Sequence, residues 1–175
     1  MAKRHLVYYG DPVLRKQAEP VKEVNDEVRL LIRDMLSIME EHRGIGLAAN
    51  QVGALLRVFI STVTGMDKEG FPIYGEPKIY INPTVTVLDD TPCIEQEGCL
   101  SIPKIYEDVA RPKKIRIEAL DENGSPFMEE KEGWEARPLL HENDHLNGVL
   151  FIDRIAPHRR QALQAQLKRI KKKHL

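Results

Sequence analysis

This sequence of 175 residues has no long apolar run and only two cysteines. Its longest apolar stretches, such as residues 6–9 and 58–60, fall far short of the ~20 residues that a membrane-spanning helix needs. The two cysteines, Cys93 and Cys99, are too few for a disulfide framework, and the basic, proline-interrupted start has no apolar segment of the kind found in secretion signals. We therefore expect no membrane partner, a cytoplasmic location and reduced cysteines.

The composition is otherwise that of a folded globular protein. Hydrophobic residues make up 42% of the chain and charged residues 30%, a balance that excludes disorder and collagen-like repeats. A chain of this length can bury about 68–70% of its unfolded surface, so it can build a core without disulfides. Because neither repeats nor linkers interrupt it, residues 1–175 are expected to form a single domain.

Residues 154–175 contain no acidic residue and eight Lys and Arg residues, so they form a basic tail. Residues 1–153 carry 18 basic and 27 acidic groups, so charge is distributed asymmetrically. Leucine and isoleucine recur at helical spacing in this tail, and Pro157 suits a first helical position, so a basic C-terminal helix is predicted at about 157–175. Such a helix either binds a polyanion such as RNA or is a solvated helix with one docked face. The recurring apolar residues are Leu163, Leu167 and Ile170.

The remaining pattern predicts an α+β fold with antiparallel sheets. Asn25 can cap an N-terminal amphipathic helix, which is followed by a glycine-rich loop at residues 44–53. Residues 55–127 have the pattern of a series of strands, and a second helix is expected at about 134–146. The order helix, strands, helix, helix does not match a parallel βαβ series.

The segment HENDH lies within the second predicted helix. His141 and His145 are four residues apart, so both imidazoles lie on one helix face and can reach one metal ion. Glu142 lies beside these ligands, where it can take a proton from a water at the metal. We expect the antiparallel sheets to pack around this metal-binding helix.

A third ligand decides the class of enzyme. Zinc proteases with such a helix take it downstream, as a Glu on a later helix or a His three residues beyond a Gly, and this sequence offers neither. Among the soft donors upstream, Cys99 stands beside Gly98 in EGCLS, whereas Cys93 is expected to be a small buried hydrophobe. Cys99, His141 and His145 would leave one coordination position open, as catalytic sites do.

Three segments together resemble the peptide deformylase family. They are GIGLAANQ at residues 44–51, EGCLS at 97–101 and HENDH at 141–145, in the family's order, and the likeness extends over nearly the whole chain. The resemblance implies hydrolysis of the formyl group from the N-terminal formyl-methionine of new polypeptides, with release of formate. It also implies one divalent metal ion, with ferrous iron as the usual metal and zinc, nickel or cobalt able to occupy the site.

The resemblance also assigns roles to individual residues. The Gln51 side chain and the Leu100 backbone N–H would stabilise the oxyanion that forms at the formyl group, and Glu142 would deliver the proton to the leaving amine. Backbone groups of three further residues would hold the peptide like an added strand. These substrate-binding residues are Ile45, Gly46 and Gly98. The expected partners are formyl-methionyl nascent polypeptides and, through the basic helix, the ribosome.

Two residues depart from the family pattern, and two other functions stay open. Leu140 stands where the family commonly has Gln and is expected to alter the wall of the substrate pocket. Pro138 would disrupt a helix interior, so the helix either starts near Arg137 or bends. The HENDH motif alone favours a zincin-like metallopeptidase. The basic tail favours a metal-stabilised module that binds RNA or the ribosome.

Overall fold

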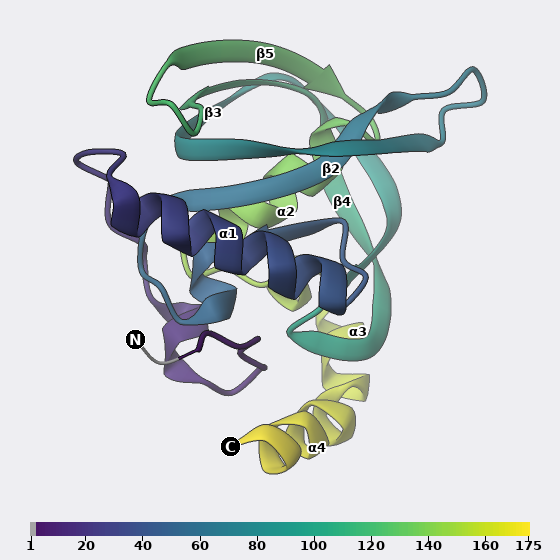
Figure 1. Cartoon of the computed structure of the whole chain (residues 1–175). Helices are drawn as coiled ribbons and strands as arrows, with labels where there is room; N and C mark the ends of the chain where they lie inside the picture. Colours follow the sequence, from purple (N-terminus) through teal and green to yellow (C-terminus); the bar gives the residue numbers. More distant parts are fainter. Residues whose placement is uncertain (1–2) are drawn as a thin grey trace.

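Two long antiparallel strands dominate the computed structural model, which describes residues 3–175 (Figure 1). They belong to a five-stranded sheet in which neighbouring strands are antiparallel and follow one another in sequence order. The predicted α+β fold with antiparallel pairing is therefore confirmed. The strands are β1 (Gly46–Ala48), β2 (Val58–Met66), β3 (Pro72–Cys99), β4 (Ile102–Leu120) and β5 (Pro126–Glu132).

Helices precede and follow this sheet. The α-helices are α1 (Asp26–Glu41), α2 (Ala136–Leu146), α3 (Pro157–Ala162) and α4 (Gln164–His174). Short 3-10 helices lie at Pro12–Arg15, Ala49–Val52 and Phe151–Asp153. Among residues 3–175, no helix combines the length and the apolar character needed to cross a membrane.

The long strands β3 and β4 bend, and the bends shape the sheet. Their pairing shifts register at several points, including one between Glu97 and Cys99. Along β4, buried and exposed side chains largely alternate, as expected of a strand with one face on the core. Because register shifts increase local twist and bending, one sheet can curve over α2, which contacts all five strands (Figure 1).

α1 begins and ends where the sequence predicts. The Asn25 side chain accepts a hydrogen bond from the Val28 N–H at 3.1 Å, and the apolar face of the helix is buried against β1 and β2. At the other end, the Gly44 N–H donates to the Met39 carbonyl at 2.9 Å. Arg43, not Gly44, takes the left-handed conformation there, with φ of 54°.

The prediction of a loop over residues 44–53 is wrong in part. Gly46–Ala48 form β1, which pairs with β2 in the register Gly46↔Ser61, and Ala49–Val52 form a 3-10 helix. Leu47 and the alanines beside it are fully buried. Burial and pairing therefore override the low strand propensity of glycine and alanine here.

α2 begins at Ala136, two residues later than predicted, and this resolves the question raised by Pro138. The helix starts near Arg137, so Pro138 is its third residue. The backbone N–H groups of the first turn have no partner within a helix, and a proline there costs no helical hydrogen bond.

The basic C-terminal segment forms two helices where one was predicted. α3 begins with Pro157, as expected. The helix is interrupted at Leu163, and α4 follows directly. Leu163, Leu167 and Ile170 are buried together with apolar residues of β4 and of the segment 150–155. One face of the tail is therefore docked on the body.

Candidate active site

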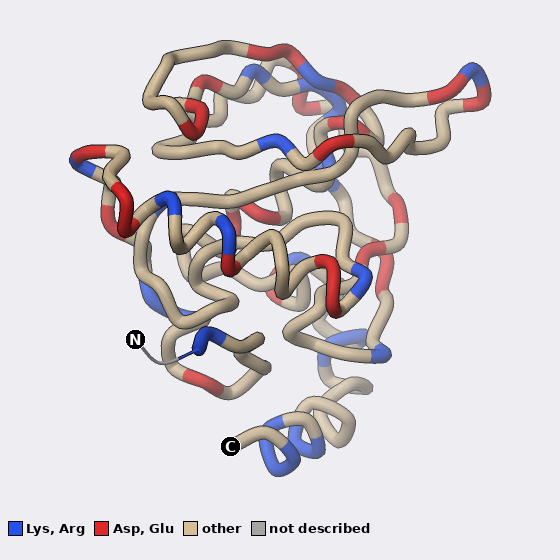
Figure 2. Tube along the Cα trace, in the orientation of Figure 1, with Lys and Arg blue, Asp and Glu red and all other residues tan. Residues whose placement is uncertain are grey.

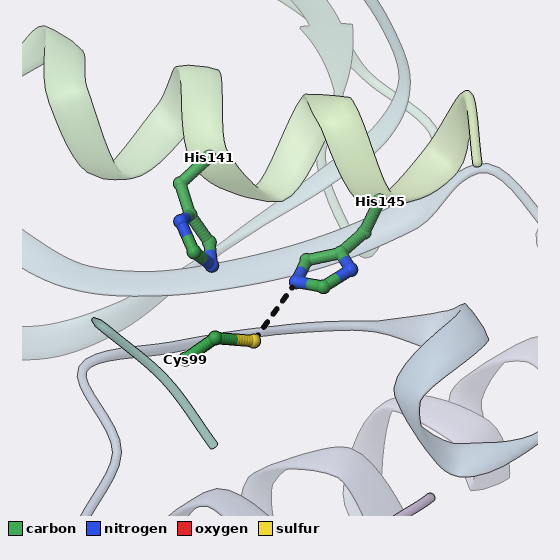
Figure 3. A group of neighbouring side chains, drawn as sticks. All are labelled: Cys99, His141 and His145. Carbon is green, nitrogen blue, oxygen red and sulfur yellow. Dashed lines mark hydrogen bonds between the residues drawn. The ribbon is translucent and has the colours of Figure 1, made fainter. Parts of the chain in front are cut away.

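Three side chains from two distant segments converge on one point. Cys99 ends β3, and His141 and His145 lie one turn apart on α2 (Figure 3). The Cys99 Sγ lies 3.4 Å from the His145 Nε2, and the potential ligand atoms of all three residues lie within 4.8 Å of one another. The structure thus brings together the three residues that the sequence predicts as metal ligands.

This donor set fits a divalent metal ion. With ordinary zinc–sulfur and zinc–nitrogen bond lengths and tetrahedral angles, the sulfur and a ring nitrogen lie about 3.5 Å apart. The observed 3.4 Å between Cys99 and His145 agrees with that spacing. One thiolate and two imidazoles suit ferrous iron and zinc alike. Cys93, expected to be a buried hydrophobe, is only partly buried and lies outside the group.

Glu97, two residues before Cys99 on β3, orients the first histidine. Its Oε1 lies 2.9 Å from the His141 Nδ1, which leaves the Nε2 of that ring available to a metal. Arg111 of β4 donates two hydrogen bonds to Glu97, both of 2.8 Å, and Arg137 donates a third of 2.6 Å. Burial alone would raise the pKa of Glu97, but the hydrogen bonds from Arg111 and His141 hold it well below its usual range. The carboxylate therefore stays charged.

Asp144 of α2 extends these ion pairs to the C-terminal segment. The Arg111 Nη1 donates to Asp144 at 2.6 Å, and Arg154 donates to both oxygens of Asp144, at 2.6 and 2.8 Å. Sequence reasoning assigned no role to Glu97, Arg111 or Asp144. The sequence nevertheless offered a hint for Glu97 and Asp144. Glu97 is a fixed position of EGCLS and Asp144 is a fixed position of H-E-x-D-H, and neither metal ligation nor proton transfer explains these two acids.

Glu142 lies in the wall of the same site and is only 5% exposed. Burial raises the pKa of Glu142 to about 7, against the opposing influence of His141. Its Oε2 is buried without a hydrogen-bond partner in the described part of the chain, so it can accept a proton. A Cβ at Gly46 would lie 2.8 Å from the Oε1, so glycine at this position leaves room for the carboxylate.

Gln51 presents its amide nitrogen to the same place. The Oε1 accepts a hydrogen bond from the Ala48 N–H at 2.9 Å, which fixes the orientation of the side chain. The Nε2 donates to the Ser101 Oγ at 3.1 Å and lies 3.5 Å from the Cys99 Sγ. This buried side chain therefore holds a donor beside the predicted ligands.

A cavity of about 520 Å³ opens onto these groups. Pro138 lies in its wall, whereas Leu140 is buried between α2 and the sheet and is not a lining residue, contrary to expectation. The remaining sequence-predicted site residues all line the cavity. They are Ile45, Gly46, Gln51, Gly98 and Leu100.

The rim of the cavity includes an open strand edge. β1 is the edge strand of the sheet, and the Ile45 carbonyl accepts the Thr62 N–H of β2 at 2.8 Å. Because backbone groups of successive residues point to opposite sides of a strand, the N–H and C=O of Gly46 point away from β2. An extended peptide could pair with this edge.

Comparisons with known proteins agree with this geometry. Residues 3–161 match the family model described as polypeptide deformylase. The chain is 46% identical over 153 residues to a peptide deformylase of Psychrobacter cryohalolentis, covering 87% of this chain and 79% of that protein. It is 43% identical over 169 residues to a peptide deformylase of Pseudomonas aeruginosa, covering 97% and 96%.

Solved structures give the same result. A peptide deformylase from Legionella pneumophila superposes with a TM-score of 0.84 at 37% identity, covering 98% of this chain and 96% of that one. A peptide deformylase from Ehrlichia chaffeensis in complex with actinonin superposes with a TM-score of 0.86 at 35% identity, covering 99% and 98%. With a family match over most of its length and relatives above 40% identity, this chain belongs to the polypeptide deformylase family.

Proposed function

We propose that residues 1–175 act as one catalytic domain, a metal-dependent hydrolase that removes the formyl group from the N-terminal formyl-methionine of newly made polypeptides and releases formate. One observation carries this proposal: the Cys99, His141 and His145 donors lie within 4.8 Å of one another, and two of them, Cys99 and His141, line a cavity together with the buried carboxylate of Glu142. Membership of the deformylase family favours this activity over the metallopeptidase and the RNA-binding module.

Cys99, His141 and His145 would hold the metal ion, which we propose is ferrous iron, with zinc, nickel or cobalt able to replace it. When bound, such an ion acts as a Lewis acid that polarises a carbonyl and lowers the pKa of water. Glu97 holds the His141 ring through its Nδ1, which supports coordination through the Nε2.

Glu142 is the proposed general base and acid. Its buried carboxylate, with one unpartnered oxygen, would take a proton from the attacking water. It would then deliver that proton to the amine nitrogen as the bond between the formyl carbon and the nitrogen breaks, so that formate and a free N-terminus are the products.

Gln51 and Leu100 would stabilise the oxyanion that forms during this attack. The Gln51 amide nitrogen is already oriented, because the opposite end of the amide is bonded to the Ala48 N–H. Preorganised donors of this kind need no rearrangement when the charge develops. The Leu100 backbone N–H follows directly after Cys99 and would supply a second donor.

The peptide would bind in extended form along the rim. The outward-facing backbone of Gly46, beside Ile45, offers the edge of β1, and Gly98 lies across the cavity at the end of β3. Pairing with an exposed strand edge recognises the backbone of any sequence, as an enzyme acting on many nascent chains requires.

Formate release from formyl-Met-Ala, by protein loaded with ferrous iron under oxygen-free conditions, tests this function. Glu142→Gln should retain the metal but lose at least about 100-fold in kcat/KM, the usual contribution of general acid–base catalysis. Glu95→Gln, an exposed carboxylate nearby on β3, serves as the control and should keep its activity. Cleavage of internal peptide bonds without formate release would instead identify a metallopeptidase.

The basic tail supports a second proposal, that the enzyme acts in the cytoplasm and binds the ribosome through α4. Arg159 and Arg160 form ion pairs with Glu107 and Asp153, whereas the five basic side chains of α4 are exposed and form no ion pair within residues 3–175. One of them, Lys171, lies over the Tyr9 ring. Figure 2 shows these cations gathered on α4, where no acidic residue intervenes. The four that do not lie over the Tyr9 ring are Lys168, Arg169, Lys172 and Lys173.

Charge reversal tests ribosome binding more cleanly than deletion, because deleting the tail would remove Leu163, Leu167 and Ile170 from the core. Changing Lys168, Arg169, Lys172 and Lys173 to Glu should weaken co-sedimentation with ribosomes and flatten its salt dependence. Changing Lys22 and Lys68, which are exposed lysines outside α4, to Glu is the control and should leave co-sedimentation unchanged. Unchanged co-sedimentation of the α4 variant at low salt would contradict the proposal.

A further inference from the structure

The charges exposed at the rim of the cavity are all of one sign. Among the cavity-lining residues, the two carboxylates, Glu97 and Glu142, are buried in the site itself. Arg43 and Lys104 line the same cavity with exposed side chains and form no ion pair within residues 3–175. The mouth of the cavity is therefore basic, although residues 1–153 as a whole carry an excess of acid.

Arg43 occupies a position that suits glycine better. It follows α1 in the left-handed conformation, φ 54°, and its N–H donates to the Glu40 carbonyl at 3.0 Å while the next N–H, of Gly44, donates to Met39. This pair of hydrogen bonds defines a helix-terminating motif in which the left-handed residue is usually glycine. An arginine accepts a steric cost there that glycine would avoid.

Lys104 is the second cavity-lining residue with a positive φ, at 64°. It lies in a bulge of β4, because the pairing moves from Glu97↔Glu107 to Cys99↔Ile102 and leaves four β4 residues opposite Gly98 alone. Bulges near active sites redirect side chains, and this one carries a lysine to the rim. Two unrelated elements, the end of α1 and the bulge of β4, thus each hold a cation at the mouth in a conformation that long side chains rarely adopt.

The two segments lie against each other. A Cβ at Gly44 would come within 2.6 Å of the Leu100 side chain, so the end of α1 touches the turn between β3 and β4 (Figure 1). The cavity between them leads from the catalytic groups to solvent. When the N-terminus of a peptide is bound in this cavity, the rest of the peptide would extend toward solvent between these two segments.

We propose that Arg43 and Lys104 are specificity-determining residues that favour formylated peptides with Asp or Glu at either of the two positions after the methionine and disfavour Lys and Arg there. This inference rests on the deformylase function proposed above. An extended chain advances about 3.3 Å per residue, so the second and third residues of the substrate lie within about 7 Å of the first. Both residues would therefore lie near the mouth of the cavity that Arg43 and Lys104 line. Charges separated by less than the Debye length, about 8 Å at physiological ionic strength, are only partly screened.

A structural role for Arg43 is the alternative, because a cation near a helix C-terminus also interacts favourably with the helix dipole. The two roles differ in their consequences. If the side chain serves the helix, Arg43→Gly should lower the melting temperature. If it serves the substrate, Arg43→Gly should leave the melting temperature unchanged or raise it, because glycine relieves the left-handed strain, and should change peptide preference.

Three formylated tripeptide amides test the proposal: formyl-Met-Ala-Asp-amide, formyl-Met-Ala-Ser-amide and formyl-Met-Ala-Lys-amide, each repeated with the second and third residues exchanged. Amidation is essential, because a free C-terminal carboxylate would itself meet the rim cations. We expect kcat/KM to be about 2-fold to 10-fold higher for the Asp peptides than for the Lys peptides at low salt, as for exposed ion pairs. The difference should lie mainly in KM and should shrink in 0.5 M salt.

The variant Arg43→Gly/Lys104→Gly should bring the Asp-to-Lys ratio close to one, and Arg43→Asn/Lys104→Asn should do the same, because asparagine also tolerates the left-handed conformation. Lys22→Ala/Arg33→Ala removes the same charge away from the cavity and should keep the ratio. Equal rates for all peptides, or a ratio that survives in both rim variants, would overturn the proposal. Failure to release formate from any peptide would instead contradict the deformylase function.

Discussion

Two charged regions of this molecule differ in burial and in whether their charges are paired. Beside the predicted metal ligands runs a buried ion-pair chain, which consists of Arg137, Glu97, Arg111 and Asp144 and ends at the exposed Arg154. On α4, by contrast, the cations are exposed and unpaired within the described residues (Figure 2). A buried charge must be compensated by fixed partners, whereas an exposed charge is compensated by water and salt. The buried chain therefore positions other groups, and the exposed charges are available to bind a partner.

The largest expected effect comes from breaking the buried ion-pair chain at its centre. Arg111→Ala would leave Glu97 and Asp144 buried without their shared cation and should lower the free energy of unfolding by about 3–5 kcal/mol. Urea denaturation measures this change. Arg116→Ala, which removes a half-exposed ion pair with Glu130, is the control and should cost no more than about 1 kcal/mol. Equal effects of the two substitutions would remove the distinction between the regions.

Glu97→Gln tests whether the buried chain acts on the metal site. Glutamine keeps the shape of the side chain but weakens the hold on the His141 Nδ1, and metal affinity should fall about 10-fold to 100-fold. Competition with a chelator measures that affinity. Glu107→Gln is a matched control, because Glu107 pairs with Glu97 across the strands but binds Arg159 and not a metal ligand. Unchanged affinity in Glu97→Gln would assign the buried chain to stability alone.

Asp153 stands between the two regions in burial and should give an intermediate, pH-dependent effect. Partial burial opposes ionisation, but hydrogen bonds from Arg15, the Leu150 N–H and Arg160 lower the pKa of Asp153 to about 2. Because the folded pKa lies below the unfolded value of about 4, the stabilisation is fully present above pH 4 and disappears as the pH falls toward 2.

The comparison of Asp153 with Asp153→Asn measures this stabilisation. Solvent screening limits it to about 1 kcal/mol at neutral pH, so denaturation curves of the two proteins should differ at pH 7 and approach each other near pH 2. Asp90→Asn, at an exposed aspartate without an ion pair in residues 3–175, should show no such convergence. A difference that stays constant from pH 7 to pH 2 would be evidence against the assigned pKa.

The sequence predicted local features of the site better than distant ones. His141 and His145 could be paired because their spacing on a helix fixes their relative position. The start of α1 could be predicted because Asn25 bonds a backbone group three residues away. The buried ion-pair chain could not, because contact between Glu97 and Arg111 depends on the register of β3 against β4, which no local pattern encodes.

The limits of individual strands are hard to predict from this sequence for a related reason. Residues 78–88 and 94–102 look like separate strands, because acidic residues and Pro92 lie between them. In the structure β3 runs through this interval with shifts in register, and the pairing with β4 compensates for the poor strand formers. Similarly, β1 forms because its residues are buried beneath α1. Its glycine and alanine have low strand propensity, so the local sequence does not predict a strand there.

The smallest expected effect is on α4. Lys168→Ala and Lys172→Ala should each change the free energy of unfolding by no more than about 0.5 kcal/mol, because neither side chain is buried or paired within the described residues. Leu167→Ala on the same helix should cost about 2–5 kcal/mol, since its side chain is buried against β4 and the segment 150–155. Thermal unfolding of the three variants separates the two faces of one helix. A large loss in either lysine variant would mean that α4 needs its charges to fold, and weaker ribosome co-sedimentation could then no longer be attributed to lost contacts with RNA.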